Sequence, residues 1–316
     1  MEEYIKKIIK GNADKLKESE IKKINIGFTN SVYSVDDKYI IKICDNKNNE
    51  KRFKNEINFY LKNKNNKYIP KLYKYYLSKD KFDYSYIIVE KINGKTLYNF
   101  WHTIEEKKRK EIIKGISLMM KSFHSVKGEK YDWSLFIKEK LIKDLNNCNS
   151  NNLFNNEEKE KLEYVIKKCS KYLESEEFGL VHSDIHFDNI LIDENDNLKL
   201  IDFETSIYAP IDYELDIFLR MCNNPIKYSS EETEKFIKIE DYKNIPNYLK
   251  EYYPEIFNFK YFNIRHLIYH LEANMRLLSR FNESELKNII LNTTNKLELL
   301  INSEENLWIL KKKKDI

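Results

Sequence analysis

The side chains best suited to chemistry gather in two short segments, VHSDIHFDNILID at 181–193 and LKLIDFE at 198–204. Asp184 offers a carboxylate for an attacking hydroxyl, and Asn189 and Asp202 offer the oxygen ligands that Mg²⁺ prefers. Both segments contain a short apolar strand pattern, and the polar turn between them predicts a hairpin. That hairpin would bring Asn189 and Asp202 to one end, with Asp184 on the loop leading in. The pattern favours metal-assisted phosphoryl transfer.

The first ninety residues have the pattern of an antiparallel sheet with one helix. Alternating β-branched and aromatic residues predict strands within 23–44, 71–78 and 83–92. Apolar residues at helical spacing predict an amphipathic helix over 50–64. Lys42 lies in one strand among isoleucines, where a charge needs a partner, and Glu56 on the helix is the candidate. Glu50 is the alternative if the helix begins in another register.

The chain after Asn93-Gly94 is mainly helical in pattern. Apolar stripes at 112–123 and 162–173 indicate core-facing helices, and 261–302 is again helical. We therefore predict an α+β, bilobal architecture. Residues 1–92 would form a small antiparallel β-sheet lobe that binds nucleotide, and residues 93–316 a larger, mainly helical catalytic and substrate-binding lobe.

The sequence HSDIHFDN at 182–189 resembles the H-x-D-x-x-x-x-N catalytic loop of the protein-kinase-like superfamily. Asp202-Phe203-Glu204 resembles its metal-binding D-F-G, with Glu replacing Gly. That replacement, together with His186, is typical of the aminoglycoside phosphotransferase and choline kinase-like family. The resemblance implies a protein-kinase-like fold, Asp184 as catalytic base, and Asn189 and Asp202 as ligands of Mg²⁺. It implies that His182 orders the loop through hydrogen bonds.

The same resemblance extends to the nucleotide, ATP or GTP, as phosphate donor. IIKI at 40–43 is similar to the strand whose Lys meets the α- and β-phosphates, and 27–32 to the loop over them. Residues 90–92 are similar to the hinge that meets the purine through its backbone. No G-x-x-x-x-G-K-[ST] is present, so a P-loop kinase is not supported. The residues implied in nucleotide binding are Gly27, Thr29, Asn30, Ser31, Lys42, Glu56, Glu90 and Ile92.

The acceptor is less defined than the donor. Residues 201–290 carry 15 Asp and Glu against 11 Lys and Arg, which suits a cationic small molecule with a hydroxyl. An aminoglycoside is the leading hypothesis, and choline, sugars and macrolides are alternatives that related families phosphorylate. Tyrosines between 213 and 261 would suit a cation cage or ordinary packing. Asp212 or Asp216 is expected to anchor the segment after Asp202.

Two hypotheses from other classes remain. One is a catalytically silent kinase-like binding protein of the spore-coat type, which would not need Lys42, Asp184, Asn189 and Asp202 together. The other is a protein kinase, against which the D-F-E form and the missing A-P-E argue.

Composition excludes several further classes. Residues 1–100 have a net charge of +9 and residues 171–220 one of −10, but no basic stripe interleaved with aromatics predicts a nucleic-acid partner. No run of 18 apolar residues predicts a membrane span, and the N-terminus lacks a signal-peptide pattern. The four cysteines form no CxxC pair and predict buried free thiols. We therefore expect a cytoplasmic protein.

Overall fold

The computed structural model describes residues 2–10, 20–24, 30–78, 84–281 and 283–314. The chain divides into two compact units. Unit 1 comprises Met1–Phe123, His182–Ile207 and Arg220–Ile245. Unit 2 comprises His124–Val181, Tyr208–Leu219 and Pro246–Ile316. The antiparallel sheet near the N-terminus and the mainly helical remainder confirm the predicted α+β fold class. The predicted functional division after residue 92 stays a prediction.

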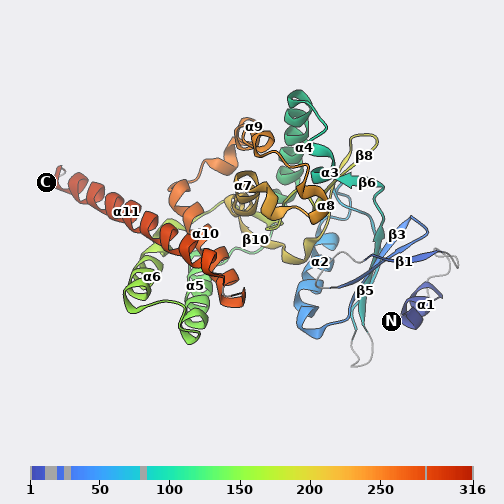
Figure 1. Ribbon diagram of the computed structural model, residues 1–316, viewed down its shortest axis with the longest axis horizontal. Helices are drawn as coiled ribbons and strands as arrows, with labels where there is room; N and C mark the ends of the chain where they lie inside the picture. Colours follow the sequence, from blue (N-terminus) through green and yellow to red (C-terminus); the bar gives the residue numbers. More distant parts are fainter. Residues whose placement is uncertain (1, 11–19, 25–29, 79–83, 282, 315–316) are drawn as a thin grey trace. The chain divides into compact units, whose positions relative to one another are not determined.

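A five-stranded antiparallel sheet forms the first part of unit 1 (Figure 1). The strand order is β1-β2-β3-β5-β4, and a turn with positive φ at Asp36 and Asp37 joins β2 to β3. The strands and the helix α2 between them confirm the predicted segments. Their bounds are β1 Ile21–Ile24, β2 Ser31–Val35, β3 Tyr39–Cys44, α2 Glu50–Lys62, β4 Leu72–Tyr76 and β5 Ser85–Glu90.

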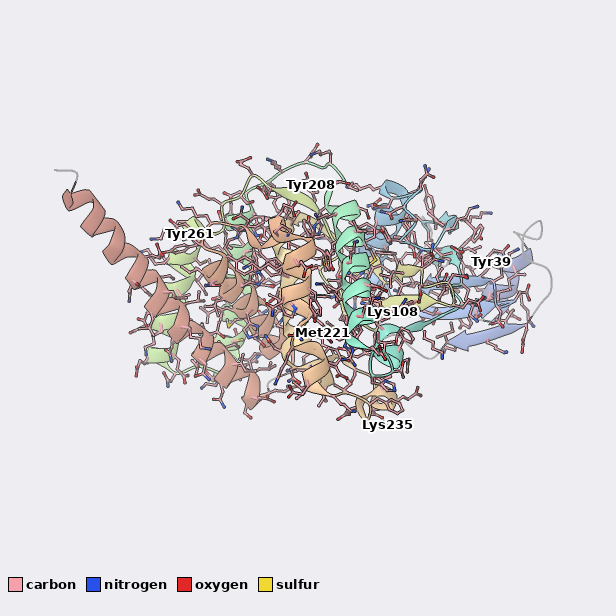
Figure 2. All side chains as sticks on the ribbon, turned by 90° about the horizontal axis from the view of Figure 1, so that it is seen from above. Tyr39, Lys108, Tyr208, Met221, Lys235 and Tyr261 are labelled. Atoms are coloured by element: carbon pink, nitrogen blue, oxygen red, sulfur yellow. The ribbon has the colours of Figure 1, made fainter. Side chains whose placement is uncertain are left out.

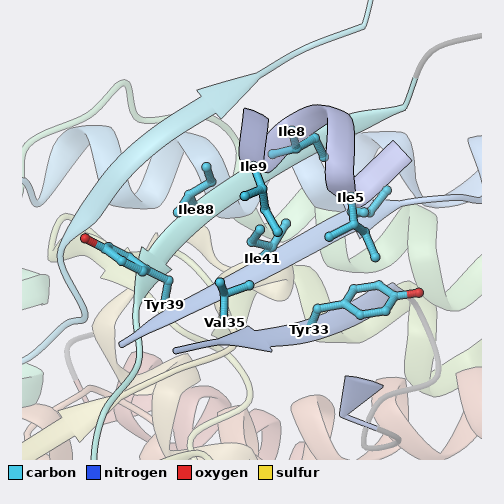
Figure 3. Close-up of a cluster of buried hydrophobic side chains, with 9 residues drawn as sticks. Ile5, Ile8, Ile9, Tyr33, Val35, Tyr39, Ile41 and Ile88 are labelled. Atoms are coloured by element: carbon cyan, nitrogen blue, oxygen red, sulfur yellow. The ribbon is translucent and has the colours of Figure 1, made fainter. Parts of the chain in front are cut away.

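An N-terminal helix, α1 (Glu2–Lys10), covers one face of this sheet and was not predicted. Ile5, Ile8 and Ile9 of α1 are buried against apolar residues of the strands (Figure 3). Their spacing of three and four residues places them on one face of the helix. The alternation of β3 sends Ile41 and Ile43 into the same cluster. The opposite face of the strand is thereby left to Lys42.

The second part of unit 1 is a smaller sheet with helices around it. Its strand order is β6-β8-β9, and β8 pairs with β9 antiparallel, which confirms the predicted hairpin. Lys108 on α4 (Figure 2) pairs with Asp196 in the turn of this hairpin, with Nζ 2.5 Å from Oδ2. The bounds are β6 Gly94–Thr96, α3 Leu97–Trp101, α4 Glu106–His124, β8 Ile190–Asp193, β9 Leu198–Leu200, the short 3-10 helix η3 Phe203–Thr205 and α8 Glu231–Glu234.

Strand β6 was not predicted, because the sequence there indicates only a turn. Gly94 pairs with Asp193 of β8, and a Cβ atom at Gly94 would lie 2.6 Å from the carbonyl oxygen of Ile192. That oxygen is backbone, so the two strands would have to separate. Glycine is therefore required for this close pairing.

Gly94→Ala should consequently destabilise the protein by about 1–3 kcal/mol, because overpacking forces backbone shifts. Gly115→Ala on α4 is the matched control. There the added Cβ meets only the flexible tip of Leu198, at 2.7 Å, and alanine favours the helix by about 0.5–1 kcal/mol. Urea unfolding of both variants measures the difference. Equal stability of the two variants would contradict the close approach of β6 and β8.

Unit 2 is mainly helical, with α5, α6, α10 and α11 packed together (Figure 1). The strand β7 pairs with β10 in a two-stranded sheet, and none of the helices in the described part of the chain is both long and apolar enough to cross a membrane. The bounds are α5 Trp133–Ser150, α6 Asn156–Cys169, β7 Phe178–Val181, β10 Ile207–Pro210, the 3-10 helix η4 Ile211–Glu214, α7 Leu215–Asn223, α9 Ile245–Tyr252, α10 Phe262–Phe281 and α11 Ser284–Lys314.

A buried ion pair ties α10 to η4 in unit 2. Arg265 donates from Nε and Nη2 to the two carboxylate oxygens of Asp212, at 2.6 and 2.8 Å. Its Nη1 donates to the carbonyl oxygens of Tyr172 and Glu174. A bidentate pair with these extra bonds satisfies both buried charges. Asp212 is thus a structural anchor, as the sequence predicts for Asp212 or Asp216.

The tyrosines between 213 and 261 that are most buried serve packing. Tyr242 packs against Trp101 within unit 1, and Tyr253 lies with its hydroxyl 2.9 Å from Nδ1 of His124 within unit 2. All four cysteines are free and buried, as expected.

His266 on α10 makes the stability of unit 2 depend on pH. Burial, and then the charges of Arg265 and His270, lower the pKa of its ring to about 3. The folded pKa lies below that of the unfolded chain, so the neutral ring contributes stability above about pH 6.5, which is lost as pH falls toward 3. We expect about 1–2 kcal/mol of this loss between pH 6.5 and 5.

His266→Phe should remove that part of the pH dependence, since the ring already packs against Phe262 with centroids 4.4 Å apart. The measurement is the free energy of unfolding of wild type and variant at pH 5, 6 and 7.5. A difference between the two that stays constant with pH would contradict the assignment.

Candidate active site

The hairpin β8–β9 places two of the predicted site residues together. The amide of Ile201 donates to the carbonyl oxygen of Asn189 over 3.0 Å, which continues the register of the two strands by one more pair. Asn189 and Asp202, which follows Ile201 in the chain, therefore lie at the same end of the hairpin. Asp202 has φ 66° and ψ 67°, a left-handed conformation that turns the chain out of β9. Such strain in a residue other than glycine is concentrated at functional sites.

The loop that carries Asp184 is fixed by its neighbours. Nδ1 of His182 accepts from the amide of Asp184 at 3.2 Å, so its Nε2 carries the proton and donates to the carbonyl of Ile201 at 3.0 Å. Nδ2 of Asn189 donates to the carbonyl oxygen of Asp184 at 2.9 Å. These bonds hold the backbone of Asp184 on both sides and leave its carboxylate one-third exposed, at 33%. His182 thus has the ordering geometry that the resemblance implies.

Lys42 lies between two carboxylates of unit 1. Its Nζ is 2.7 Å from Oε1 of Glu56 and 3.4 Å from Oδ1 of Asp202. Burial alone would lower the pKa of Lys42, but the two carboxylates outweigh it and raise that pKa, so the ammonium stays charged. Burial also raises the pKa of Glu56, which the charge of Lys42 opposes. Glu50, the alternative partner, pairs instead with Lys54.

The donor atoms at the end of the hairpin fit a magnesium ion. Nδ2 of Asn189 is used for the carbonyl of Asp184, so Oδ1 is the atom suited to a metal. Burial would raise the pKa of Asp202, yet the charge of Lys42 lowers it below its usual value and keeps the carboxylate ionised. Mg²⁺ commonly takes one or two protein ligands and completes its shell with phosphate oxygens and water. The described residues contain no cluster of three His, Cys, Asp or Glu that could hold a metal ion. A site formed by Asn189 and Asp202 needs no such cluster, because it supplies only two oxygen ligands.

The candidate nucleotide loop is only partly within the described residues. Gly27 and Thr29 lie outside them. Nδ2 of Asn30 lies 3.4 Å from Oε2 of Glu204. The hydroxyl of Ser31 donates to Asp45 at 2.5 Å, so this donor is committed within the protein. Their contact with phosphate stays a prediction.

The predicted hinge begins at Glu90, the last residue of β5. The amide of Glu90 donates to the carbonyl of Lys71 at 2.8 Å, and the Glu90 carboxylate accepts from the amide of Lys71 at 3.0 Å. The next amide, that of Lys91, donates to the carbonyl of Lys38. Ile92 follows directly and lies just before β6. The segment is thus anchored to the sheet, and its contact with the purine stays a prediction.

Glu204 is the residue that sequence reasoning missed. The sequence shows it only as the residue that replaces Gly after Asp202-Phe203. In the structure its carboxylate accepts from Nη1 of Arg52 on α2, at 3.2 Å, and is buried. The preceding Phe203 stacks on Phe59 of the same helix, with centroids 4.1 Å apart. The signal in the sequence is an acidic residue, Glu204, directly after the mainly apolar segment at 198–203. A carboxylate in such a segment is expected to have a partner when it is buried.

The phosphotransferase enzyme family, APH, matches residues 20–236. Solved structures of similar fold include a streptomycin–ATP–APH(2″)-IIa ternary complex, with a TM-score of 0.67 and 16% identity over 93% of this chain and 95% of that chain. ADP-bound APH(2″)-Ib has a TM-score of 0.64 and 17% identity over 92% and 96%.

Among curated proteins, the human hormonally up-regulated neu tumor-associated kinase (Homo sapiens) is 38% identical over 69 residues. Its homologue in Xenopus tropicalis is 47% identical over 47 residues. These stretches are 22% and 15% of this chain, but only 10% and 7% of the kinases' own lengths. Because the family model matches residues 20–236, this chain belongs to the phosphotransferase enzyme family.

Proposed function

We propose that this protein is a Mg²⁺-dependent small-molecule kinase that transfers the γ-phosphate of ATP or GTP to a hydroxyl of an aminoglycoside-like antibiotic. The observation that carries the proposal is the position of Lys42, 2.7 Å from Glu56 and 3.4 Å from Asp202, in the unit that also holds Asp184 and Asn189. A catalytically silent binding protein would not need this complete set.

Each residue has a role in the proposed mechanism. Lys42, kept charged by two carboxylates, neutralises the α- and β-phosphates. Asn189 and Asp202 would hold magnesium, which when bound neutralises charge on the phosphates and orients them. Asp184, on a loop fixed by hydrogen bonds, orients the acceptor hydroxyl and takes its proton. Positioning and charge stabilisation supply most of the acceleration.

The acceptor class is supported by two observations. Neighbours of the same fold were solved with streptomycin, gentamicin and hygromycin B, all bound to aminoglycoside phosphotransferases. Residues 201–290 of this chain carry a net charge of −4, which suits a cationic acceptor. We include residues 1–92 as the nucleotide-binding part and 93–316 as the catalytic and acceptor-binding part of this proposal.

The test is Mg²⁺-dependent consumption of ATP and GTP with a panel of aminoglycosides, macrolides, choline and sugars. Turnover should appear with one aminoglycoside subclass and vanish with EDTA. Turnover with choline or a sugar alone would replace the acceptor and keep the reaction. Failure to bind either nucleotide would refute the kinase and favour the binding-protein hypothesis.

A further inference from the structure

Glu204 connects three segments of unit 1 through one buried carboxylate. Its own segment is η3, two residues after the candidate magnesium ligand Asp202. Oε1 accepts from Nη1 of Arg52 on α2 at 3.2 Å, and Oε2 lies 3.4 Å from Nδ2 of Asn30. Asn30 directly precedes β2 and belongs to the candidate nucleotide loop. The side chain of Glu204 is only 8% exposed, so its charge depends on these partners.

Helix α2 is thereby held by two ion pairs from one face. Arg52 and Glu56 are four residues apart, so their side chains lie on the same side of the helix. Glu56 binds Lys42 of β3, and Arg52 binds Glu204 of η3. Lys42 also contacts Asp202, so β3, α2 and the start of η3 form one connected set of charges. Any change in the placement of α2 would alter both the phosphate-binding Lys and the metal-binding Asp.

The backbone around Glu204 is fastened independently to the catalytic loop. The hydroxyl of Ser183 donates to the carbonyl of Thr205 at 2.7 Å, and the hydroxyl of Thr205 donates to the carbonyl of His182 at 3.1 Å. Glu204 therefore stands on a segment whose position is already fixed. It can act as a fixed point to which the side chains of Arg52 and Asn30 are attached.

We propose that Glu204 is a positioning residue for the nucleotide. By holding Arg52 and Asn30, it sets α2 and the end of the nucleotide loop against the phosphate and metal ligands before the nucleotide binds. The inference rests on the proposed kinase function. Preorganisation of this kind reduces the ordering cost of binding, so its loss weakens nucleotide affinity more than it slows the chemical step.

The experiment is a double-mutant cycle with E204Q, R52Q and the double variant in the full-length protein. We measure the Kd of Mg·ADP by calorimetry and the KM and kcat for the nucleotide. Each single variant should raise Kd and KM on the order of 5- to 20-fold, with kcat within about 3-fold. The double variant should be no worse than either single one, because both remove the same interaction.

The matched control is the pair Glu50–Lys54 on the same helix. Nζ of Lys54 is 2.6 Å from Oε1 of Glu50, but both side chains are exposed. E50Q and K54Q should leave the Kd of Mg·ADP unchanged. R52Q leaves the buried carboxylate of Glu204 without its cation, whereas E204Q and the double variant remove that charge, so E204Q and the double variant carry the test if R52Q fails to fold. Asn30→Ala then tests the contact between Glu204 and Asn30 alone.

Three results would overturn the inference. They are unchanged Kd in R52Q and E204Q, strictly additive effects in the double variant, and a raised Mg²⁺ requirement with unchanged Kd for ADP. The last would make Glu204 a direct metal ligand. Wild-type protein that binds no nucleotide would refute the proposed kinase itself, whereas active wild type with unaffected variants refutes only the role of Glu204.

Discussion

Replacing Asp184 by Asn is expected to lower kcat about 10²- to 10⁴-fold while the Kd of the nucleotide changes little. The amide cannot take the proton of the acceptor hydroxyl. The substitution keeps the size of the side chain, and the bonds that hold this residue to His182 and Asn189 use its backbone amide and carbonyl. The loop should therefore keep its conformation. Single-turnover kinetics with saturating nucleotide and the best acceptor of the panel measure the loss.

Asp188→Asn is the matched control for Asp184→Asn. It removes a carboxylate from the same loop, four residues from Asp184. Burial raises the pKa of Asp188 above its usual value, although the charge of His186 and a hydrogen bond from the Thr96 side chain oppose this shift. Its kcat should stay near that of wild type. If Asp184→Asn keeps full turnover, or if both variants lose activity equally, Asp184 is not the base.

Lys42→Met should lower both activity and stability. A second variant should recover the stability but not the activity. Without Lys42, the fully buried carboxylate of Glu56 has lost its cation at 2.7 Å, and breaking such a pair costs about 3–5 kcal/mol. The phosphates lose their cation as well. In the double variant Lys42→Met/Glu56→Gln the buried charge is gone, so most of the stability should return while activity stays lost.

The pH dependence of Lys42→Met provides an independent measurement. Burial raises the folded pKa of Glu56 above its unfolded value, and without Lys42 nothing opposes the shift. A group with a raised folded pKa stabilises the protein below its unfolded pKa, near 4.5, and that contribution disappears as pH rises through the folded value. Lys42→Met should thus be more stable at pH 5 than at pH 8, relative to the double variant. Full stability of Lys42→Met at pH 8 would show that the pair is not what holds Glu56.

Interactions over short sequence distances could be predicted because local patterns specify them. The strands at 190–193 and 198–200 and the turn between them form one hairpin, which places Asn189 beside Asp202 whatever the rest of the chain does. The pair Lys42–Glu56 spans only 14 residues, and a lysine among isoleucines demands a partner on the next element. These two local facts were enough to predict most of the candidate site.

Longer-range partners could not be predicted, because several candidates satisfy the same pattern. The sequence around Gly94 indicates only a turn. Glycine is required there because the carbonyl oxygen of Ile192 on β8 would lie 2.6 Å from a Cβ atom at this position. The apolar face of α1 indicates burial but names no partner, and only the fold shows that it covers the sheet. Glu204 meets Arg52 and Asn30, which are 152 and 174 residues away in the chain.

The amino-acid sequence alone predicted the chemistry, namely a base at Asp184, metal ligands at Asn189 and Asp202 and a charged Lys42, because each of these predictions depends on residue type and short-range spacing. The tertiary structure decided what holds that chemistry in place. The packing of Phe59 and Tyr60 on Phe203 determines which face of α2 meets η3, and this packing brings Arg52 to Glu204. Packing of two elements distant in sequence is a collective property of all their side chains, so no single motif encodes it.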